Sequence, residues 1–164
     1  MLNFKISSVL IIVSAIIGIS LSFIYFYNQT NTAKLSVTTI TGQSFYLADL
    51  LGKPVLINFW ASDCPACMEE IPLLTEFYQR NRDVAVLAVA MPYDPPNRVL
   101  NIVNSRQIPY TIALDPQAEI SNAFGKVVNT PAWFLLNAKG NIIYKKLGKL
   151  NWQELQQTLD AESF

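Results

Sequence analysis

Two nearly continuous apolar runs constrain the fold of this chain more than any other feature. The first is VLINFWA, residues 55–61, and the second is VAVLAVAM, residues 84–91. A strand with one solvated face alternates apolar and polar residues, whereas a strand covered on both faces is apolar at almost every position. The stretch between the runs has apolar residues at helical spacing, namely Ile71, Leu74, Phe77 and Tyr78. The order strand, helix, strand predicts two parallel strands at the centre of an α/β domain.

The rest of the chain extends this pattern on both sides. We expect a short hairpin that turns at Thr41-Gly42, and a second hairpin from strands at 132–137 and 141–147. Asn151 is a good N-cap for a last helix. The further expected elements are helices at 64–81, 97–107, 116–125 and 151–161 and a strand at 110–115. These elements predict an α/β fold with a central mixed β-sheet flanked by helices and an N-terminal β-hairpin extension.

An uncharged apolar run, Ile6–Tyr27, lies near the N-terminus. At about 1.5 Å per helical residue it is long enough to cross a bilayer, so it predicts one N-terminal transmembrane helix. A cleaved signal peptide is the alternative, but aromatic residues from Phe23 onward stand where small residues would mark a cleavage site. Lys5 before the run favours an N-terminus in the cytoplasm.

The chain therefore divides into three expected parts. Residues 1–28 form a cytoplasmic tip and membrane anchor, residues 29–34 a polar tether, and residues 35–164 one domain. We expect a single-pass protein of the cytoplasmic membrane whose domain lies in the periplasm or another extracytoplasmic space.

Composition excludes several classes of function. Twelve basic and twelve acidic residues give no net charge, and no block of like charge indicates a nucleic-acid surface. Two cysteines without any histidine cannot supply the four ligands of a zinc site within one chain. We therefore expect no metal, no cofactor and no nucleic acid. A domain of this size buries enough core to fold without disulfides, so the cysteines are free for another role.

Both cysteines lie where the first apolar run gives way to the helix, as Cys64-Pro65-Ala66-Cys67. Unpaired backbone N–H groups and the helix dipole stabilise a thiolate at Cys64, which we expect to be partly exposed and nucleophilic. Pro65 suits the first helical position. Cys67, one turn deeper, is placed to resolve a mixed disulfide. An inert structural disulfide is disfavoured because so short a loop removes little entropy from the unfolded chain. The pattern predicts thiol–disulfide exchange.

The segment FWASDCPACMEEIP resembles the active site of thioredoxin-fold proteins. The anchor, the INFWAS strand and NTPAWFLLNAKGNIIYKKLG resemble the TlpA/ResA-like branch of extracytoplasmic thiol–disulfide oxidoreductases, which also carries an insertion like residues 110–125. The resemblance implies a thioredoxin-like fold, a kinking Pro72 and a cis proline at Thr130-Pro131. It implies that Cys64 and Cys67 are catalytic and that Pro65, Ala66, Thr130 and Pro131 bind substrate.

Two positions depart from that family, namely Asp63 and Ala66, where proline or glutamate is common. Asp63 stands where tryptophan is usual and opposes a thiolate at Cys64, unless it is only a solvated acid at the helix N-terminus. Asn58 replaces the buried acid that manages the proton of the second cysteine in cytoplasmic thioredoxins. Glu69 or Glu70, or water, would then move that proton, although we interpret both glutamates as solvated helix residues.

The resemblance favours a protein disulfide reductase that maintains dithiols, for example in cytochrome c maturation. It implies protein substrates and a membrane electron donor of the DsbD or CcdA kind. A DsbA-like oxidant is the nearest alternative. A peroxiredoxin-type peroxidase and a Cu(I) delivery protein that binds the metal on Cys64 and Cys67 are the alternatives from other classes.

Overall fold

The computed structural model describes residues 12–20 and 34–162 of the chain. Within these residues the strands form one seven-stranded sheet in the order β2-β1-β5-β4-β3-β6-β7. The elements, in chain order, are β1 (Ser36–Thr39), β2 (Ser44–Tyr46), the 3₁₀ helix η1 (Leu47–Leu50), β3 (Val55–Trp60), α2 (Pro65–Arg80), β4 (Ala85–Ala90), α3 (Pro96–Arg106), β5 (Thr111–Leu114), α4 (Glu119–Ala123), β6 (Ala132–Leu136), β7 (Ile142–Leu147) and α5 (Trp152–Glu162).

The sheet is mixed, as the sequence predicted. Strands β3, β4 and β5 are parallel neighbours. On the other side of β3, β6 pairs antiparallel with β3, and β7 pairs antiparallel with β6. The N-terminal hairpin of β1 and β2 extends the sheet beyond β5, and Gly42 in its turn has a φ of 81°, which favours glycine. Every residue of β3 and β4 is buried, so the prediction of two strands covered on both faces is confirmed.

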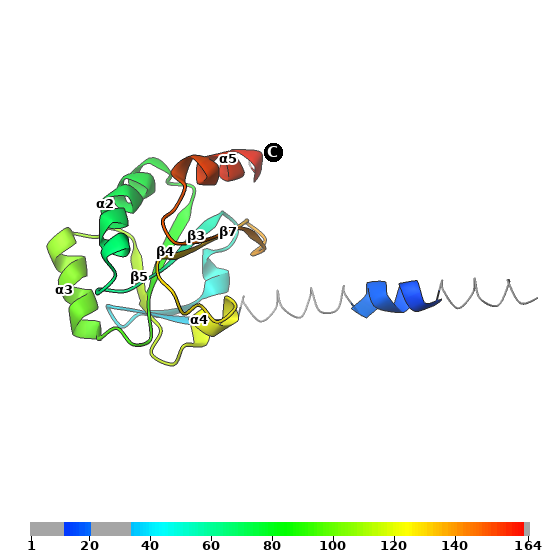
Figure 1. The fold of residues 1–164 in the computed structure, drawn as a ribbon, viewed down its shortest axis with the longest axis horizontal. Coiled ribbons are helices and arrows are strands. Elements are labelled where there is room, and N and C mark those ends of the chain that lie inside the picture. The colour runs from blue at the N-terminus through cyan, green and yellow to red at the C-terminus, as the bar shows by residue number, and fades with distance from the viewer. Residues whose placement is uncertain (1–11, 21–33, 163–164) are drawn as a thin grey trace, which may run out of the picture.

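Helices cover both faces of the sheet (Figure 1). Helices α2 and α3 connect successive parallel strands that step in one direction, so right-handed crossovers place both on the same face. Helix α5 joins them there, where the rings of Phe77 and Trp152 lie 5.6 Å apart between centroids. Helix α4 lies on the opposite face, where Phe124 packs on the sheet.

The strand register gathers several loops at one end of the sheet. Trp60 pairs with Ala90, and Phe59 pairs with Ala132, the first residue of β6. Ala132 in turn pairs with Leu147, the last residue of β7. The ends of β3, β4, β5 and β7 and the start of β6 therefore meet at what we call the carboxyl end of the sheet, and the loops that leave them lie close together.

The predicted transmembrane segment falls largely outside the described residues. Residues 12–20 of the run are helical. In the portions that the structure covers, 12–20 and 34–162, no helix has both the length and the apolar character needed to cross a membrane.

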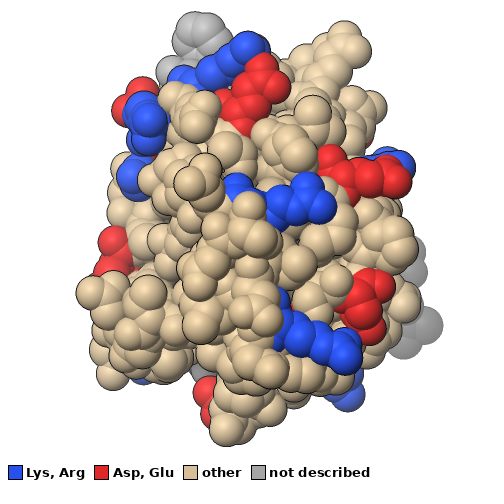
Figure 2. Space-filling model, turned by 90° about the vertical axis from the view of Figure 1, so that its left-hand side faces the viewer, with Lys and Arg blue, Asp and Glu red and all other residues tan. Residues whose placement is uncertain are grey.

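Charge on the domain is dispersed. On the face shown in Figure 2, basic and acidic side chains are interspersed over a largely uncharged surface. Arg80 and Glu76, one turn apart on α2, form an exposed ion pair. Such solvated pairs contribute little to stability.

Phe59 is the centre of the core between the sheet and α4. Its side chain has no solvent exposure, and its ring lies 5.6 Å from Phe124 and 5.7 Å from Phe134 between centroids. We expect Phe59→Ala to lower the free energy of unfolding by about 3–5 kcal/mol because it leaves a cavity among these rings. Urea unfolding of the oxidised protein measures this loss. Val128→Ala, at a residue that is 73% exposed, is the control and should change stability by less than about 0.5 kcal/mol.

Candidate active site

Cys64 and Cys67 form a disulfide at the N-terminus of α2, with their Cα atoms 5.2 Å apart. Cys64 is the N-cap residue of the helix, with extended backbone angles, and its sulfur accepts a hydrogen bond of 3.1 Å from the backbone N–H of Cys67. Pro65 is the first helical residue, where no hydrogen bond is lost. When the disulfide is reduced, we expect the same N–H and the helix dipole to stabilise the Cys64 thiolate.

The two cysteines differ in exposure as predicted, but Cys64 is less exposed than expected. Cys64 is 8% exposed and Cys67 is 4% exposed. The expectation of a partly exposed Cys64 is therefore wrong for the oxidised form, because the disulfide and the surrounding loops cover most of its surface. Asp63 and Pro65 on either side of it are exposed, and Ala66 is half-buried.

Thr130 and Pro131 lie at the same carboxyl end of the sheet. The peptide bond between them is cis, as the family resemblance implied. They immediately precede β6, and the Pro131 carbonyl accepts a hydrogen bond of 2.8 Å from the N–H of Gly148. Because Ala132 pairs with Phe59 at the end of β3, the fold brings Thr130 and Pro131 to the loop that carries Cys64.

Glu70 is not the solvated residue that the sequence analysis expected. Its side chain is buried, at 4% exposure, and accepts a hydrogen bond of 2.6 Å from the N–H of Leu150, 80 residues further on. The prediction fails because the segment before α5 packs over this turn of α2. The helical spacing offered a signal, since Glu70 follows Cys67 by three residues and precedes Leu74 by four, both on the buried face.

Glu69 behaves as expected. It is exposed at the helix surface and forms an ion pair with Lys149. The side-chain hydrogen bond to Glu69 raises the pKa of Lys149.

Burial raises the pKa of Glu70 above its ordinary value of 4.5. The Leu150 N–H, the indole N–H of Trp133 and the charge of Lys149 oppose that shift, and Glu69 adds to it. The Trp133 N–H faces the Glu70 carboxyl without reaching the geometry of a full hydrogen bond, so we treat it as a nearby dipole. A raised pKa makes the Glu70 carboxylate a stronger base toward a thiol than a solvated glutamate is.

Cys67 and Glu70 line one small cavity with Asn58 of β3. Asn58 is buried at 6% exposure and stands where cytoplasmic thioredoxins have an acid. In this chain the buried carboxyl beside the second cysteine therefore comes from the helix rather than from the strand.

Asp94 is a residue of this site that the sequence analysis missed. Asp94 lies in the proline-rich segment PYDPPN after β4, points inward and is 7% exposed. Its carboxylate accepts two hydrogen bonds of 2.6 Å from Ser62, one from the backbone N–H and one from the hydroxyl. The loop after β4 thereby holds the loop that carries Cys64. A single aspartate in a turn gave no sequence signal for a partner 32 residues away.

A family model described as Redoxin matches residues 28–161 of this chain. The chain belongs to the Redoxin family. Among curated relatives of this Redoxin protein, ResA of Bacillus thuringiensis subsp. konkukian, a thiol-disulfide oxidoreductase, is 30% identical over 124 residues, covering 75% of this chain and 71% of the relative. The protein of the same name from Bacillus cereus strain ATCC 10987 is 28% identical, covering 92% and 91%.

Solved structures agree with the fold of this Redoxin protein. MTB dsbF, in mixed oxidised and reduced forms, has a TM-score of 0.73 at 27% identity and covers 81% of this chain and 98% of that one. StoA from Bacillus subtilis has a TM-score of 0.65 at 25% identity, with 76% and 94% covered. The fold is thus thioredoxin-like, and with its cysteine pair the chain is a thiol–disulfide oxidoreductase of the ResA type.

The raised pKa of Glu70 predicts how the stability of this Redoxin protein depends on pH. The contribution of a raised carboxyl is fully present below the unfolded pKa of 4.5 and is lost as the pH rises through the folded pKa. Glu70→Gln has no titrating carboxyl at this position and therefore lacks this pH dependence. The free energy of unfolding of the wild type, relative to that of the variant, should fall from pH 4.5 upward. Urea unfolding of both oxidised proteins across this range measures the trend. Glu69→Gln, one residue away and exposed, should show no comparable trend.

Loss of the Asp94 carboxylate should loosen the loop before Cys64. We expect Asp94→Ala to lower the free energy of unfolding by about 2–4 kcal/mol, since two hydrogen bonds to a charged acceptor are lost and the Ser62 N–H is left unpaired. Ser62→Ala keeps the backbone donor and should cost about 1 kcal/mol. Equal losses in the two variants, measured by urea unfolding, would contradict this role.

Proposed function

We propose that this protein is an extracytoplasmic, membrane-anchored reductase of protein disulfides that acts through Cys64 and Cys67. The observation that carries the proposal is the asymmetry of the pair. Cys64 is the N-cap residue of the helix and the more exposed of the two cysteines, while Cys67 lies one turn deeper beside the buried Glu70 carboxyl. That arrangement suits one cysteine to attack from the outside and the other to resolve from the inside.

The reaction proceeds by two thiolate attacks. The Cys64 thiolate attacks one sulfur of a substrate disulfide, forms a mixed disulfide and releases the other substrate sulfur as a thiolate. Cys67 then loses its proton to Glu70 and attacks the Cys64 sulfur, which closes the Cys64–Cys67 disulfide and releases the second substrate thiolate. Two electrons pass from the cysteine pair to the substrate, and a donor dithiol restores the pair by the reverse exchange.

Two acidic side chains favour the reducing direction. Asp63 is exposed next to Cys64, and Glu70 is buried one turn beyond Cys67. Negative charge near a thiol disfavours its thiolate, and destabilised thiolates shift the equilibrium toward the disulfide. A pair that is more stable as the disulfide gives up its electrons readily. The N–H of Cys67 and the helix dipole act in the opposite sense at Cys64.

Substrate docks at the carboxyl end of the sheet in this proposal. Pro65 and Ala66 border the outer cysteine, and Thr130 precedes the cis peptide bond at the start of β6. The backbone around Thr130 can pair with an extended substrate segment as an added strand would. An unfolded chain that presents a cysteine disulfide fits this mode of binding.

The place of action and the partners follow from the family resemblance. The uncharged run Ile6–Tyr27 anchors the chain in the cytoplasmic membrane, with the domain outside. Reduction in an oxidising compartment needs a supply of electrons, which a membrane thiol transporter of the DsbD or CcdA kind provides. Haem-binding cysteines of apocytochrome c, or a comparable dithiol, are the proposed substrates.

The reduction potential of the Cys64–Cys67 couple tests the direction of electron flow. Equilibration with glutathione or dithiothreitol buffers should give a value near or below that of thioredoxin, about −270 mV. A value near that of DsbA, about −120 mV, would make the protein an oxidant and overturn the reductase proposal.

Substitution of each cysteine tests their separate roles. Cys67→Ser should accumulate a mixed disulfide between Cys64 and a disulfide-containing peptide, because the resolving thiol is gone. Cys64→Ser should accumulate none. Mass spectrometry of the non-reduced products measures both, and trapping at Cys67 in the Cys64→Ser variant would reverse the assignment.

A further inference from the structure

The outer cysteine lies between two exposed neighbours. Cys64 is only 8% exposed, whereas Asp63 before it and Pro65 after it are both exposed. A substrate sulfur that approaches Cys64 therefore meets these two residues first. Only Asp63 carries a charge, and within residues 12–20 and 34–162 it forms no ion pair. Its carboxylate is therefore available to a bound substrate.

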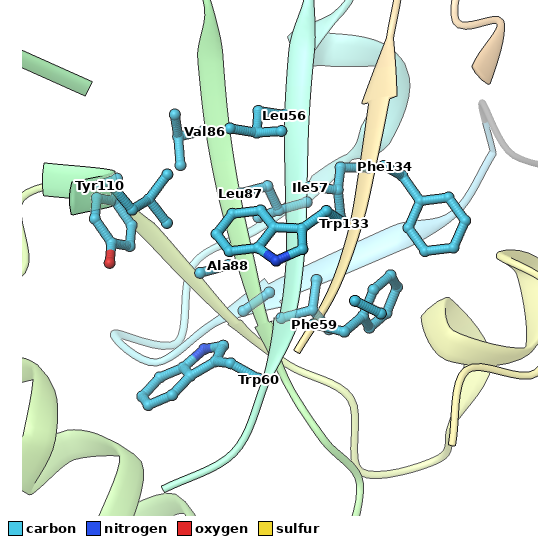
Figure 3. Close-up of a cluster of buried hydrophobic side chains, with 14 of the residues drawn as sticks. Leu56, Ile57, Phe59, Trp60, Val86, Leu87, Ala88, Tyr110, Trp133 and Phe134 are labelled. Carbon is cyan, nitrogen blue, oxygen red and sulfur yellow. The ribbon is translucent and has the colours of Figure 1, made fainter. Parts of the chain in front are cut away.

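Two contacts hold the loop that carries Asp63 against the loop after β4. Figure 3 shows Trp60 where β3 ends, and the carbonyl of this residue accepts a hydrogen bond of 3.0 Å from the N–H of Met91. Two residues further along, Ser62 donates its N–H and its hydroxyl to the buried carboxylate of Asp94. The two loops are therefore fixed side by side before any substrate binds.

Tyr93 is an exposed aromatic residue on the second of these loops. Its side chain is 58% exposed, and it directly precedes Asp94. Asp63 directly follows Ser62 in the same way, so each of the two exposed residues is one step of about 3.8 Å along the chain from a hydrogen-bonded partner. The hydrogen bonds therefore hold Asp63 and Tyr93 as neighbours on the surface beside the outer cysteine.

Other charges at the carboxyl end of the sheet do not neutralise Asp63. Glu69 pairs with Lys149. Asp94 accepts its hydrogen bonds from an uncharged serine, so its negative charge adds to that of Asp63. Because Coulomb interactions weaken with distance, the carboxylate next to Cys64 has the largest effect there. In the described part of the chain, two exposed basic residues of nearby elements form no ion pair with Asp63, namely Arg98 in α3 and Lys126 after α4.

A basic side chain fits this pair of residues. An arginine or lysine can place its charge at the Asp63 carboxylate and its apolar stem on the ring of Tyr93. A cation over a tyrosine ring gains a further attraction. The same chain contains such a contact elsewhere, where the guanidinium of Arg82 lies 5.3 Å from the ring centroid of Tyr78. An acidic side chain in this place would be repelled by Asp63.

We propose that Asp63 and Tyr93 together form a subsite for a basic side chain next to the reactive cysteine of the substrate. The inference rests on the proposed function and names its substrate class, which is extended segments with arginine or lysine beside the cysteine. Asp63 selects by charge, and Tyr93 selects by contact with the stem and the cation. Because hydrogen bonds already fix both loops, binding orders little additional chain.

A set of peptide disulfides tests the subsite with the reduced full-length protein. Each peptide has one cysteine flanked on both sides by arginine, citrulline or glutamate, and this cysteine is joined to thionitrobenzoate by a disulfide. Release of the coloured thiolate measures the rate. Citrulline has the shape of arginine without its charge. We expect the wild type to react at least about tenfold faster with the arginine peptide than with the glutamate peptide, and high salt to reduce this ratio.

Substitution of Asp63 tests selection by charge. Asp63→Asn should lower the ratio of the arginine rate to the glutamate rate at least about fivefold, because both the attraction and the repulsion are lost. Asp83→Asn is the matched control, since this exposed acid lies before β4 at the opposite end of the sheet, and it should leave the ratio unchanged. Ratios within one variant do not depend on the amount of active protein or on the reactivity of Cys64.

Substitution of Tyr93 tests selection by contact. Tyr93→Leu should lower the ratio of the arginine rate to the citrulline rate about twofold to fourfold, because the cation–π attraction is lost. The ratio of the citrulline rate to the glutamate rate should stay unchanged. Tyr46→Leu is the matched control, because Tyr46 in β2 is equally exposed at 58% but lies at the far edge of the sheet.

The outcomes separate the subsite from the proposed function. Equal wild-type rates with the arginine and glutamate peptides would overturn the subsite, as would an arginine preference that survives in Asp63→Asn. An unchanged ratio of the arginine rate to the citrulline rate in Tyr93→Leu would overturn the part given to Tyr93. If the wild type releases no coloured thiolate from any of the peptides, the thiol–disulfide exchange of the proposed function fails instead.

Discussion

Backbone pairing of the buried strand β3 on both its sides is the constraint on which the site depends. Its register with β4 and with β6 fixes where three separate loops end. Cys64 follows β3, Asp94 follows β4 and Pro131 precedes β6, so residues up to 67 positions apart meet without any covalent link beyond the chain itself. A shift of one residue in either pairing would turn the core side chains of β3 to the wrong face and separate these loops.

The site is ordered from the surface inward. The exposed Asp63 lies outermost, the disulfide lies beneath it, and a buried carboxyl with two indoles lies behind Cys67. Charge is therefore kept where water can solvate it, except at the buried carboxyls of Asp94 and Glu70. Each exception is compensated by hydrogen-bond donors or dipoles, as is usual for an acid inside a protein. Asp94 accepts from Ser62, and Glu70 accepts from the Leu150 N–H and lies near the Trp133 dipole.

The sequence predicted the features that depend on local pattern. Continuous apolar runs identified β3 and β4, and the cysteine spacing identified the helix N-terminus. The burial of Glu70 and the inward turn of Asp94 were not predicted, because each depends on a partner 80 or 32 residues away. Contacts between residues so far apart in the chain depend on sheet register and helix packing. They produce no local sequence pattern around a single acidic residue. The cis peptide bond between Thr130 and Pro131 could be predicted only from the family resemblance.

The hydrogen bond from Leu150 to Glu70 also defines how much of the chain the chemistry requires. A protein that ended after β7 would keep every strand, both cysteines and the cis peptide bond. It would nevertheless expose the inner acid to solvent and lose the amide that holds it. The C-terminal helix is thus a cover for the redox centre as well as a part of the scaffold, and natural variation in its length or sequence can adjust the proton chemistry of Cys67 without altering any residue of the CPAC motif.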